Sequence, residues 1–224
     1  MPTYPLADLS LEQLGELCEL QHRGVCPGFW DDRPLGDLTE DEQRFLATLR
    51  KHIVPYSVHL ANEATIWARA IYPLLLLAEQ DDIRAFSSVP LRGQLPSGEL
   101  RGEVDGAMAH IGIQADAQPP YLVVVEAKRG VEASDPVAQL LGGLLCAAVK
   151  NQKKRPRAEQ RLYGAYTVAD VWTFLQATVT GLDEGRPAMT TIASREYTEK
   201  TEADLILRLL KSMVAELVAA ERQH

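Results

Sequence analysis

The spacing of apolar positions changes along the chain, and near the N-terminus it predicts two helices. The segment SLEQLGELCELQ begins with Ser10 and carries leucines at helical spacing, and a second amphipathic segment, TEDEQRFLATLRKHI, begins with Thr39. Serine and threonine are favoured N-cap residues, so each segment is expected to start a helix there. We therefore expect residues 1–57 to form an N-terminal helical appendage, either a cap over the core or the surface of a homodimer.

The middle of the chain changes from a helical to an alternating pattern. Residues 60–79 are expected to form a third helix, kinked by Pro73 because proline lacks an N–H and clashes with the preceding turn. Apolar and polar positions then alternate over 83–94 and 98–110, with a Pro-Ser-Gly turn signal between the two runs. The sequence therefore predicts a hairpin.

The second half of the chain predicts strands on both sides of a buried helix. An apolar strand at 121–128 precedes a nearly all-apolar helix at 137–149. Further strands and a closing helix are expected at 163–167, 170–180, 188–197 and 202–221. This order favours an α/β fold with a mixed sheet flanked by helices, in which residues 58–224 form one core domain of the 224-residue chain.

Three charged residues stand in two of the predicted strands. The run Leu-Val-Val-Val leads directly into Glu126, Ala127 and Lys128, and Asp105 lies in the strand before it. Side chains alternate along a strand, so Glu126 and Lys128 project together, and Asp105 can meet them if the register allows. Because burying charges is costly unless they are paired, this pattern indicates a site where two carboxylates and an ammonium group converge.

A divalent metal ion is the simplest explanation for that convergence. Neighbouring carboxylates repel, which raises the pKa of one of them unless a cation lies between them. Oxygen ligands with positions left for water are those that Mg²⁺ prefers. For Asp105 alone, a turn carboxylate before Gly106 would be the plain explanation, and only the later Glu-Ala-Lys segment outweighs it.

Asp105 followed by Glu126-Ala127-Lys128 resembles the motif of the PD-(D/E)xK nuclease superfamily, which has the restriction-endonuclease-like fold. The similarity extends over about residues 58–180. NEATIWARAIYPLL is similar to the first core helix of several branches, DPVAQLLGGLLCAA to the helix after the Glu-x-Lys strand, and YGAYTVADVWTFLQAT to the strand pair that follows. The chain departs from the motif at Val104, where the family pattern has proline.

The resemblance implies a Mg²⁺-dependent nuclease, with Mn²⁺ as a substitute metal, that hydrolyses phosphodiester bonds in nucleic acid, with DNA expected before RNA. Asp105, Glu126 and the backbone carbonyl of Ala127 would bind the metal, and Lys128 would orient the attacking water or stabilise negative charge. It also places two further residues at the site. Glu63 would hold a second metal or a water, and Gln139 would position Lys128 or a phosphate oxygen.

Simpler roles remain open for the last two residues, and other functions remain open for the protein. Glu63 could only complement the helix dipole, and Gln139 could be a buried amide bonded to backbone. A nuclease-like fold that binds nucleic acid or protein without cutting is the main alternative function. A glycoside hydrolase using Asp105 and Glu126 as acid and base ranks far below it, because that chemistry leaves Lys128 unexplained.

The charge of the chain limits where nucleic acid could bind. The net charge of −8 has the wrong sign for a surface that attracts nucleic acid everywhere, so contact must be local. Lys153, Lys154, Arg155 and Arg157 belong to a basic cluster that could contact phosphates, or could be a solvated connection between elements. Three cysteines without disulfide or zinc spacing fit a cytoplasmic location, and no apolar run is long enough to span a membrane.

Overall fold

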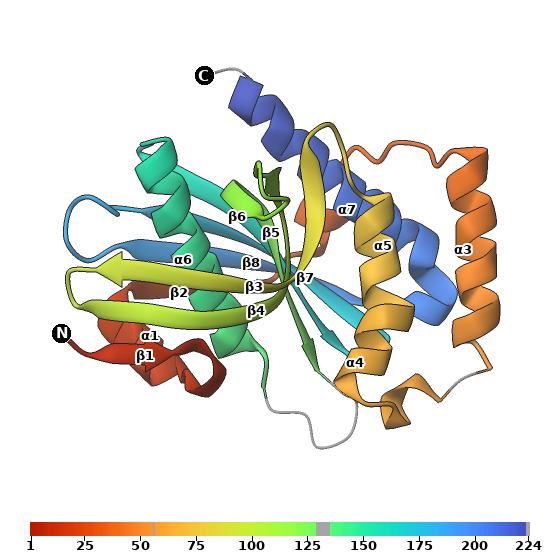
Figure 1. Ribbon diagram of the computed structural model, residues 1–224, viewed down its shortest axis with the longest axis horizontal. Helices are drawn as coiled ribbons and strands as arrows, with labels where there is room; N and C mark the ends of the chain where they lie inside the picture. The colour runs from red at the N-terminus through yellow and green to blue at the C-terminus, as the bar shows by residue number, and fades with distance from the viewer. Residues whose placement is uncertain (56, 129–134, 223–224) are drawn as a thin grey trace.

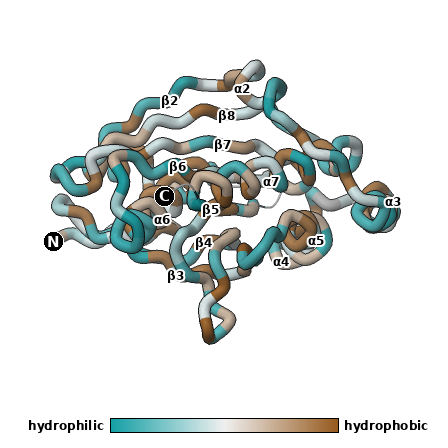
Figure 2. The backbone as a smooth tube through the Cα atoms, turned by 90° about the horizontal axis from the view of Figure 1, so that it is seen from above, coloured by the Kyte–Doolittle hydropathy of each residue, from teal (hydrophilic) through white to brown (hydrophobic). Residues whose placement is uncertain are grey.

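The computed structural model describes residues 1–55, 57–128 and 135–222. Its centre is a mixed sheet of eight strands in the order β1-β4-β5-β6-β7-β8-β2, with β3 paired to β4 (Figures 1 and 2). The strands are β1 Thr3–Pro5, β2 Glu19–Val25, β3 Ile83–Leu95, β4 Gly98–Ile111, β5 Ala117–Lys128, β6 Glu159–Val168, β7 Val171–Thr180 and β8 Ala188–Thr198. The α/β class and the mixed sheet predicted from the sequence are confirmed.

Helices cover both faces of the sheet. They are α1 Leu11–Leu17, α2 Pro27–Asp31, α3 Glu40–Ile53, α4 Glu63–Ile66, α5 Tyr72–Leu77, α6 Val137–Lys154 and α7 Glu199–Arg222, with short turns η1 Leu6–Asp8 and η2 Val58–Leu60 and a π-helical segment η3 Trp67–Ile71. Among the described helices, none combines the length and the apolar character that a bilayer crossing requires.

Two hydrophobic cores lie on opposite faces of the sheet. On one face α6 packs against the strands through Leu140 and Leu144, together with Val124 of β5. On the other face α7 packs with α3 and α5, and its Leu210 belongs to the same core as Val125. Alternate residues of β5 therefore enter different cores, so that both faces of this central strand are buried.

The N-terminal region corrects the prediction of a helical appendage. Strand β1 pairs in parallel with β4, and β2 pairs in parallel with β8, so this region adds two strands to the sheet. Helix α1 ends at Leu17, and the residues predicted to continue it, from Glu19 onward, form β2. Leucine spacing reflects only local periodicity, whereas the conformation of residues 19–25 is determined by pairing with the distant strand β8.

The helix predicted after Thr39 is confirmed as α3. Thr39 Oγ1 accepts a hydrogen bond from the Glu42 N–H at 3.2 Å, and Glu42 Oε2 accepts one from the Thr39 N–H at 2.7 Å. This reciprocal capping box satisfies two N–H groups that the helix itself leaves without partners.

The helix predicted at 60–79 is interrupted. It begins only after Asn62, whose Oδ1 accepts a hydrogen bond from the Thr65 N–H at 2.8 Å, while Leu60 lies outside it and is 70% exposed. The π-helical segment η3 then separates α4 from α5, just before Pro73. The proline distortion was expected, and it takes the form of a widened turn because proline cannot donate to the carbonyl one turn earlier.

Candidate functional site

Asp105 lies where β4 separates from β5. The C-terminal part of β4 pairs with β5 as far as Gly106 opposite Val125, whereas its N-terminal part pairs with β1 from Glu99 to Arg101. In the gap between these two pairings, Asp105 Oδ2 accepts a hydrogen bond from the Ala127 N–H at 2.6 Å. A side-chain oxygen thus takes the place of the backbone carbonyl that a continuous ladder would supply.

The backbone of Ala127 faces the same gap. The N–H and C=O of one strand residue point to the same side of the strand, so the Ala127 carbonyl is directed toward the β4 side, as its N–H is. The next residue faces the other way, because the Lys128 carbonyl accepts a hydrogen bond from the Ala169 N–H at 2.9 Å. Ala127 therefore offers its carbonyl oxygen beside the Asp105 carboxylate.

Glu126 and Lys128 form the second half of the site, on the α6 side of β5. Lys128 Nζ donates to Glu126 Oε1 at 3.2 Å and to Gln139 Oε1, on α6, also at 3.2 Å. Glu126 is fully buried, and its second oxygen, Oε2, accepts no hydrogen bond from a donor among the described residues, although Glu126 and Asp105 lie close enough to share a proton. The structure therefore brings the predicted Glu126, Lys128 and Gln139 together, and the hydrogen bond between Lys128 and Gln139 is the contact that a positioning role for Gln139 would need.

Burial dominates the electrostatics of the two carboxyl groups. It raises the pKa of Glu126 to about 8, reinforced by the charge of Asp105 and opposed by the Lys128 ammonium. Burial also raises the pKa of Asp105, while the hydrogen bond from Ala127, the charge of Lys128 and a hydrogen bond with Glu126 lower it. Two acids that each disfavour ionisation beside one another form a place where a cation would be stabilised.

Glu63 lies near these residues but at the surface. It is exposed and is the first residue of α4. Its negative charge raises the pKa of Asp105, but by less than burial does. A first-turn glutamate also complements the positive end of the helix dipole, so the structure is compatible with both roles predicted for Glu63. No group of three or more acidic, histidine or cysteine side chains with metal-site geometry occurs among the described residues.

The donors that are present fit a hard divalent cation. No donor among the described residues reaches the buried Glu126 Oε2, so a proton shared with Asp105 or a cation is needed to satisfy it. Asp105 and the Ala127 carbonyl supply two further oxygens from the neighbouring gap. Mg²⁺ in proteins is typically bound by a few protein oxygens, and water or substrate occupies its remaining coordination positions.

The sequence did not indicate two aromatic residues that border the site. Gly106, next to Asp105, packs so closely under the Trp67 ring that a Cβ atom there would collide with it, and Trp67 Nε1 donates to Ser87 Oγ at 2.8 Å. Tyr166 is the register partner of Glu126 on β6. Only the parallel pairing of β5 with β6 places Tyr166 beside Glu126, and this pairing cannot be predicted from the sequence of either strand alone.

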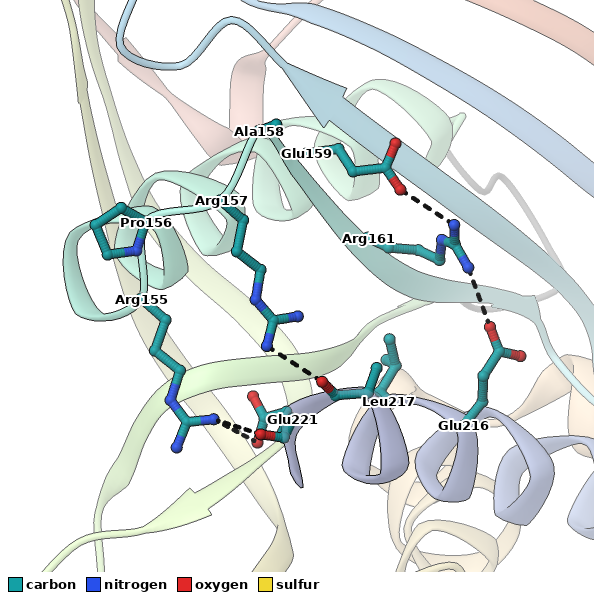
Figure 3. A pocket seen from close by; sticks show the side chains of 10 residues that line it. Arg155, Pro156, Arg157, Ala158, Glu159, Arg161, Glu216, Leu217 and Glu221 are labelled. Carbon is teal, nitrogen blue, oxygen red and sulfur yellow. Dashed lines mark hydrogen bonds and ion pairs between the residues drawn. The ribbon is translucent and has the colours of Figure 1, made fainter. Parts of the chain in front are cut away.

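The basic cluster lies at the C-terminal end of α6, whereas Gln139 lies near its N-terminal end. Lys153 follows Gln139 by fourteen positions in α6, which corresponds to about 21 Å along the helix axis. Figure 3 shows Arg155 and Arg157 of the cluster directed toward the end of α7. Arg155 Nη1 donates to the Glu221 carbonyl at 3.3 Å and Arg157 Nη2 donates to the Ala220 carbonyl at 3.4 Å. Both arginines thus bind the last turn of α7, which favours a structural role for them.

The other two members of the cluster, Lys153 and Lys154, are exposed. A contact with phosphates therefore remains a prediction for these lysines. It would require a nucleic acid that reaches well beyond the site residues.

A scan against protein-family models found no match to the chain, and a search of curated proteins found none either. The superfamily resemblance therefore rests on the motif residues of the sequence.

Proposed function

We propose that the protein is a Mg²⁺-dependent nuclease that hydrolyses phosphodiester bonds in nucleic acid, with DNA the preferred substrate, on a restriction-endonuclease-like fold. One observation carries the proposal. A fully buried glutamate, Glu126, has one oxygen bound to Lys128, and its other oxygen receives no hydrogen bond from a described donor and stands beside the Asp105 carboxylate. A structural role alone gives no reason to bury this arrangement, because an ion pair between surface residues would avoid the desolvation cost.

Asp105, Glu126 and the Ala127 carbonyl would hold the metal ion. Bound there, Mg²⁺ would polarise a phosphate oxygen and lower the pKa of a coordinated water. The water oxygen forms the new bond to phosphorus and releases a proton to solvent as the ester P–O bond breaks, and the leaving oxygen takes up a proton from solvent. The residues of the chain act by placing these groups, which supplies much of the rate enhancement in phosphoryl transfer.

Lys128 acts on the charge that develops during attack. Its Nζ has three protons, and its partners among the described residues are Glu126 and Gln139, so we assign the third proton to the attacking water or a phosphate oxygen. An ammonium group held by two partners loses little further freedom when the substrate reacts, so its stabilisation of negative charge is preorganised. Gln139 is in this description a positioning residue, because it acts through Lys128.

Cleavage assays of the full-length protein test the proposal. Supercoiled plasmid, linear duplex and single-stranded DNA, and RNA, are incubated with Mg²⁺, with Mn²⁺ or with chelator. The proposal predicts metal-dependent products from at least one substrate and none with chelator. Absence of cleavage from every substrate with either metal, together with tight binding of nucleic acid, would identify the non-catalytic binding module instead.

A further inference from the structure

An apolar cavity begins one strand away from Glu126, on the α6 side of the sheet. Glu126, Tyr166 and Thr173 are successive register partners on β5, β6 and β7, and both Tyr166 and Thr173 line a cavity of about 680 Å³. Neighbouring strands lie about 4.8 Å apart, so these two residues stand roughly 5 and 10 Å from the backbone of Glu126. The cavity is therefore within the reach of one nucleotide whose phosphate occupies the site.

Helix α6 connects the cavity to the site residues. Val137 and Leu141 line the cavity, and Gln139, which lies between them in the sequence, binds Lys128. The same short stretch of helix thus forms one wall of the cavity and positions the ammonium group of the site. A group that fills the cavity would contact the turn of α6 on which Lys128 depends.

Most of the surface that lines the cavity is apolar and it remains open to water, although half of the lining residues carry polar atoms, among them Arg195 and Glu196. Leu20, Leu175 and Met189 lie inside, and Val25 and Leu11, at the margin, are 58% and 47% exposed. Exposed aliphatic side chains around a concave surface are typical of a binding site. The volume lies in the range of pockets that hold small organic groups, which is roughly 300 to 1,000 Å³.

Among the polar residues of the lining, His22 and Thr191 give the cavity one directional feature. His22 Nδ1 and Thr191 Oγ1 are hydrogen-bonded at 2.8 Å, and both residues line the cavity. The other ring nitrogen, Nε2, has no partner among the described residues, so it is available to the polar edge of a ligand. Apolar walls, an aromatic ring and a hydrogen-bonding group match the two faces and the edge of a nucleobase.

We infer that this cavity, referred to below as the base groove, receives an unpaired base of the nucleotide next to the reacting phosphate, so that the substrate is single-stranded nucleic acid. The inference rests on the proposed function. A base inside a duplex is stacked on both sides and cannot enter such a cavity, whereas an unpaired base gives up much less to do so. Stacking on Tyr166 would then contribute to affinity without requiring a particular sequence.

Binding measurements without cleavage test the inference. Short DNA strands carrying the fluorescent base 2-aminopurine are titrated with full-length protein in Ca²⁺ or chelator, as single strands and as duplexes. Wild type should bind the single strand at least about tenfold more tightly than the duplex, with a fluorescence change confined to one or two positions. Equal affinity for both forms, or no binding of either, would overturn the inference.

Two substitutions connect the binding to the base groove. Ala193→Phe would fill the cavity, and Tyr166→Ala would remove its ring; each should weaken single-strand binding about tenfold or more. Ile113→Phe, at a fully exposed loop position, is the matched control and should leave binding unchanged. Thermal melting tests whether each variant is folded. If Ala193→Phe does not fold, Tyr166→Ala alone tests the base groove.

The outcomes separate the inference from the proposed function. Duplex cleavage that Ala193→Phe and Tyr166→Ala leave intact would keep the nuclease and overturn the base groove. Single-strand binding that both variants weaken, without cleavage in any metal, would keep the groove and overturn the nuclease. A dimer that Ala193→Phe dissociates, with single-strand binding unchanged, would assign the cavity to a second copy of the chain and overturn the inference.

Discussion

Asp105 Oδ2 accepts a hydrogen bond from the backbone N–H of Ala127 at 2.6 Å, at the point where β4 leaves β5. This bond ties a site carboxylate to the strand that carries the other site residues. It also gives Asp105 a structural role that an amide can reproduce, since the oxygen of asparagine accepts a hydrogen bond as well. Charge and geometry at this position can therefore be tested separately.

Metal binding should require the charge of both carboxylates. Asp105→Asn and Glu126→Gln keep the shape of each side chain, and each is expected to weaken Mn²⁺ or Mg²⁺ binding by roughly tenfold or more. Calorimetric titration measures the affinity. Glu103→Gln, on the same strand and exposed, is the matched control and should bind metal as wild type does. Equal metal affinity in all four proteins would remove the metal from this site.

Gln139 should affect cleavage only through Lys128. Gln139→Ala leaves Lys128 Nζ with Glu126 as its described partner, so the rate of cleavage should fall by about tenfold while metal affinity is retained. The double variant with Lys128→Ala should then be no slower than Lys128→Ala alone. Additive losses in single-turnover rates would show that Gln139 acts independently of the lysine.

Much of the site was predictable because its signals are local. Strand alternation places Glu126 and Lys128 on one face, and Gln139 is conspicuous as a polar residue in an apolar helix. The separation of β4 from β5 was not predictable. It depends on β1 pairing with the N-terminal part of β4, and β1 consists of only three residues with no strong β pattern.

The edge strand β2 shows the same limit of local pattern. Its residues alternate weakly, and their mostly exposed side chains give no hydrophobic signal for a strand. Pairing with β8 determines its conformation, and the base groove exists only because that pairing places Leu20 and Val25 beside β8. A feature built from two distant segments therefore requires the fold itself.

Stability should fall with rising pH because of a second buried acid, Glu199. Burial raises its pKa to about 8 from an ordinary value of 4.5, although a hydrogen bond from Trp172 Nε1 at 3.0 Å lowers it. The folded state therefore holds this proton more tightly than the unfolded state. Below about pH 4.5 Glu199 is protonated in both states and does not lower the free energy of unfolding. That free energy then decreases as the pH rises from about 4.5 to about 8.

Glu199→Gln should flatten this dependence. The amide cannot ionise and keeps an oxygen for Trp172, so we expect the variant to gain on the order of 1 to 3 kcal/mol over wild type at pH 8 and little at pH 4.5. Urea unfolding at several pH values measures the difference. A constant difference between the two proteins across this range would show that Glu199 does not titrate as described.

The basic cluster should divide into two functional pairs. Arg155→Ala with Arg157→Ala removes hydrogen bonds to the end of α7 and should lower the free energy of unfolding by about 1 to 2 kcal/mol. Lys153→Ala with Lys154→Ala should leave stability unchanged and reduce the salt dependence of nucleic-acid affinity. An unchanged salt slope in the lysine pair would assign these side chains to solvent.

The most direct test of a catalytic site compares cleavage with metal binding in two variants. Lys128 is assigned to the reaction and not to metal coordination, so Lys128→Ala should lose about a hundredfold or more in rate while its metal affinity stays near that of wild type. Asp105→Asn should lose both, and Lys51→Ala, at an exposed position on α3, should lose neither. Lys128→Ala that cleaves as fast as wild type would contradict the account.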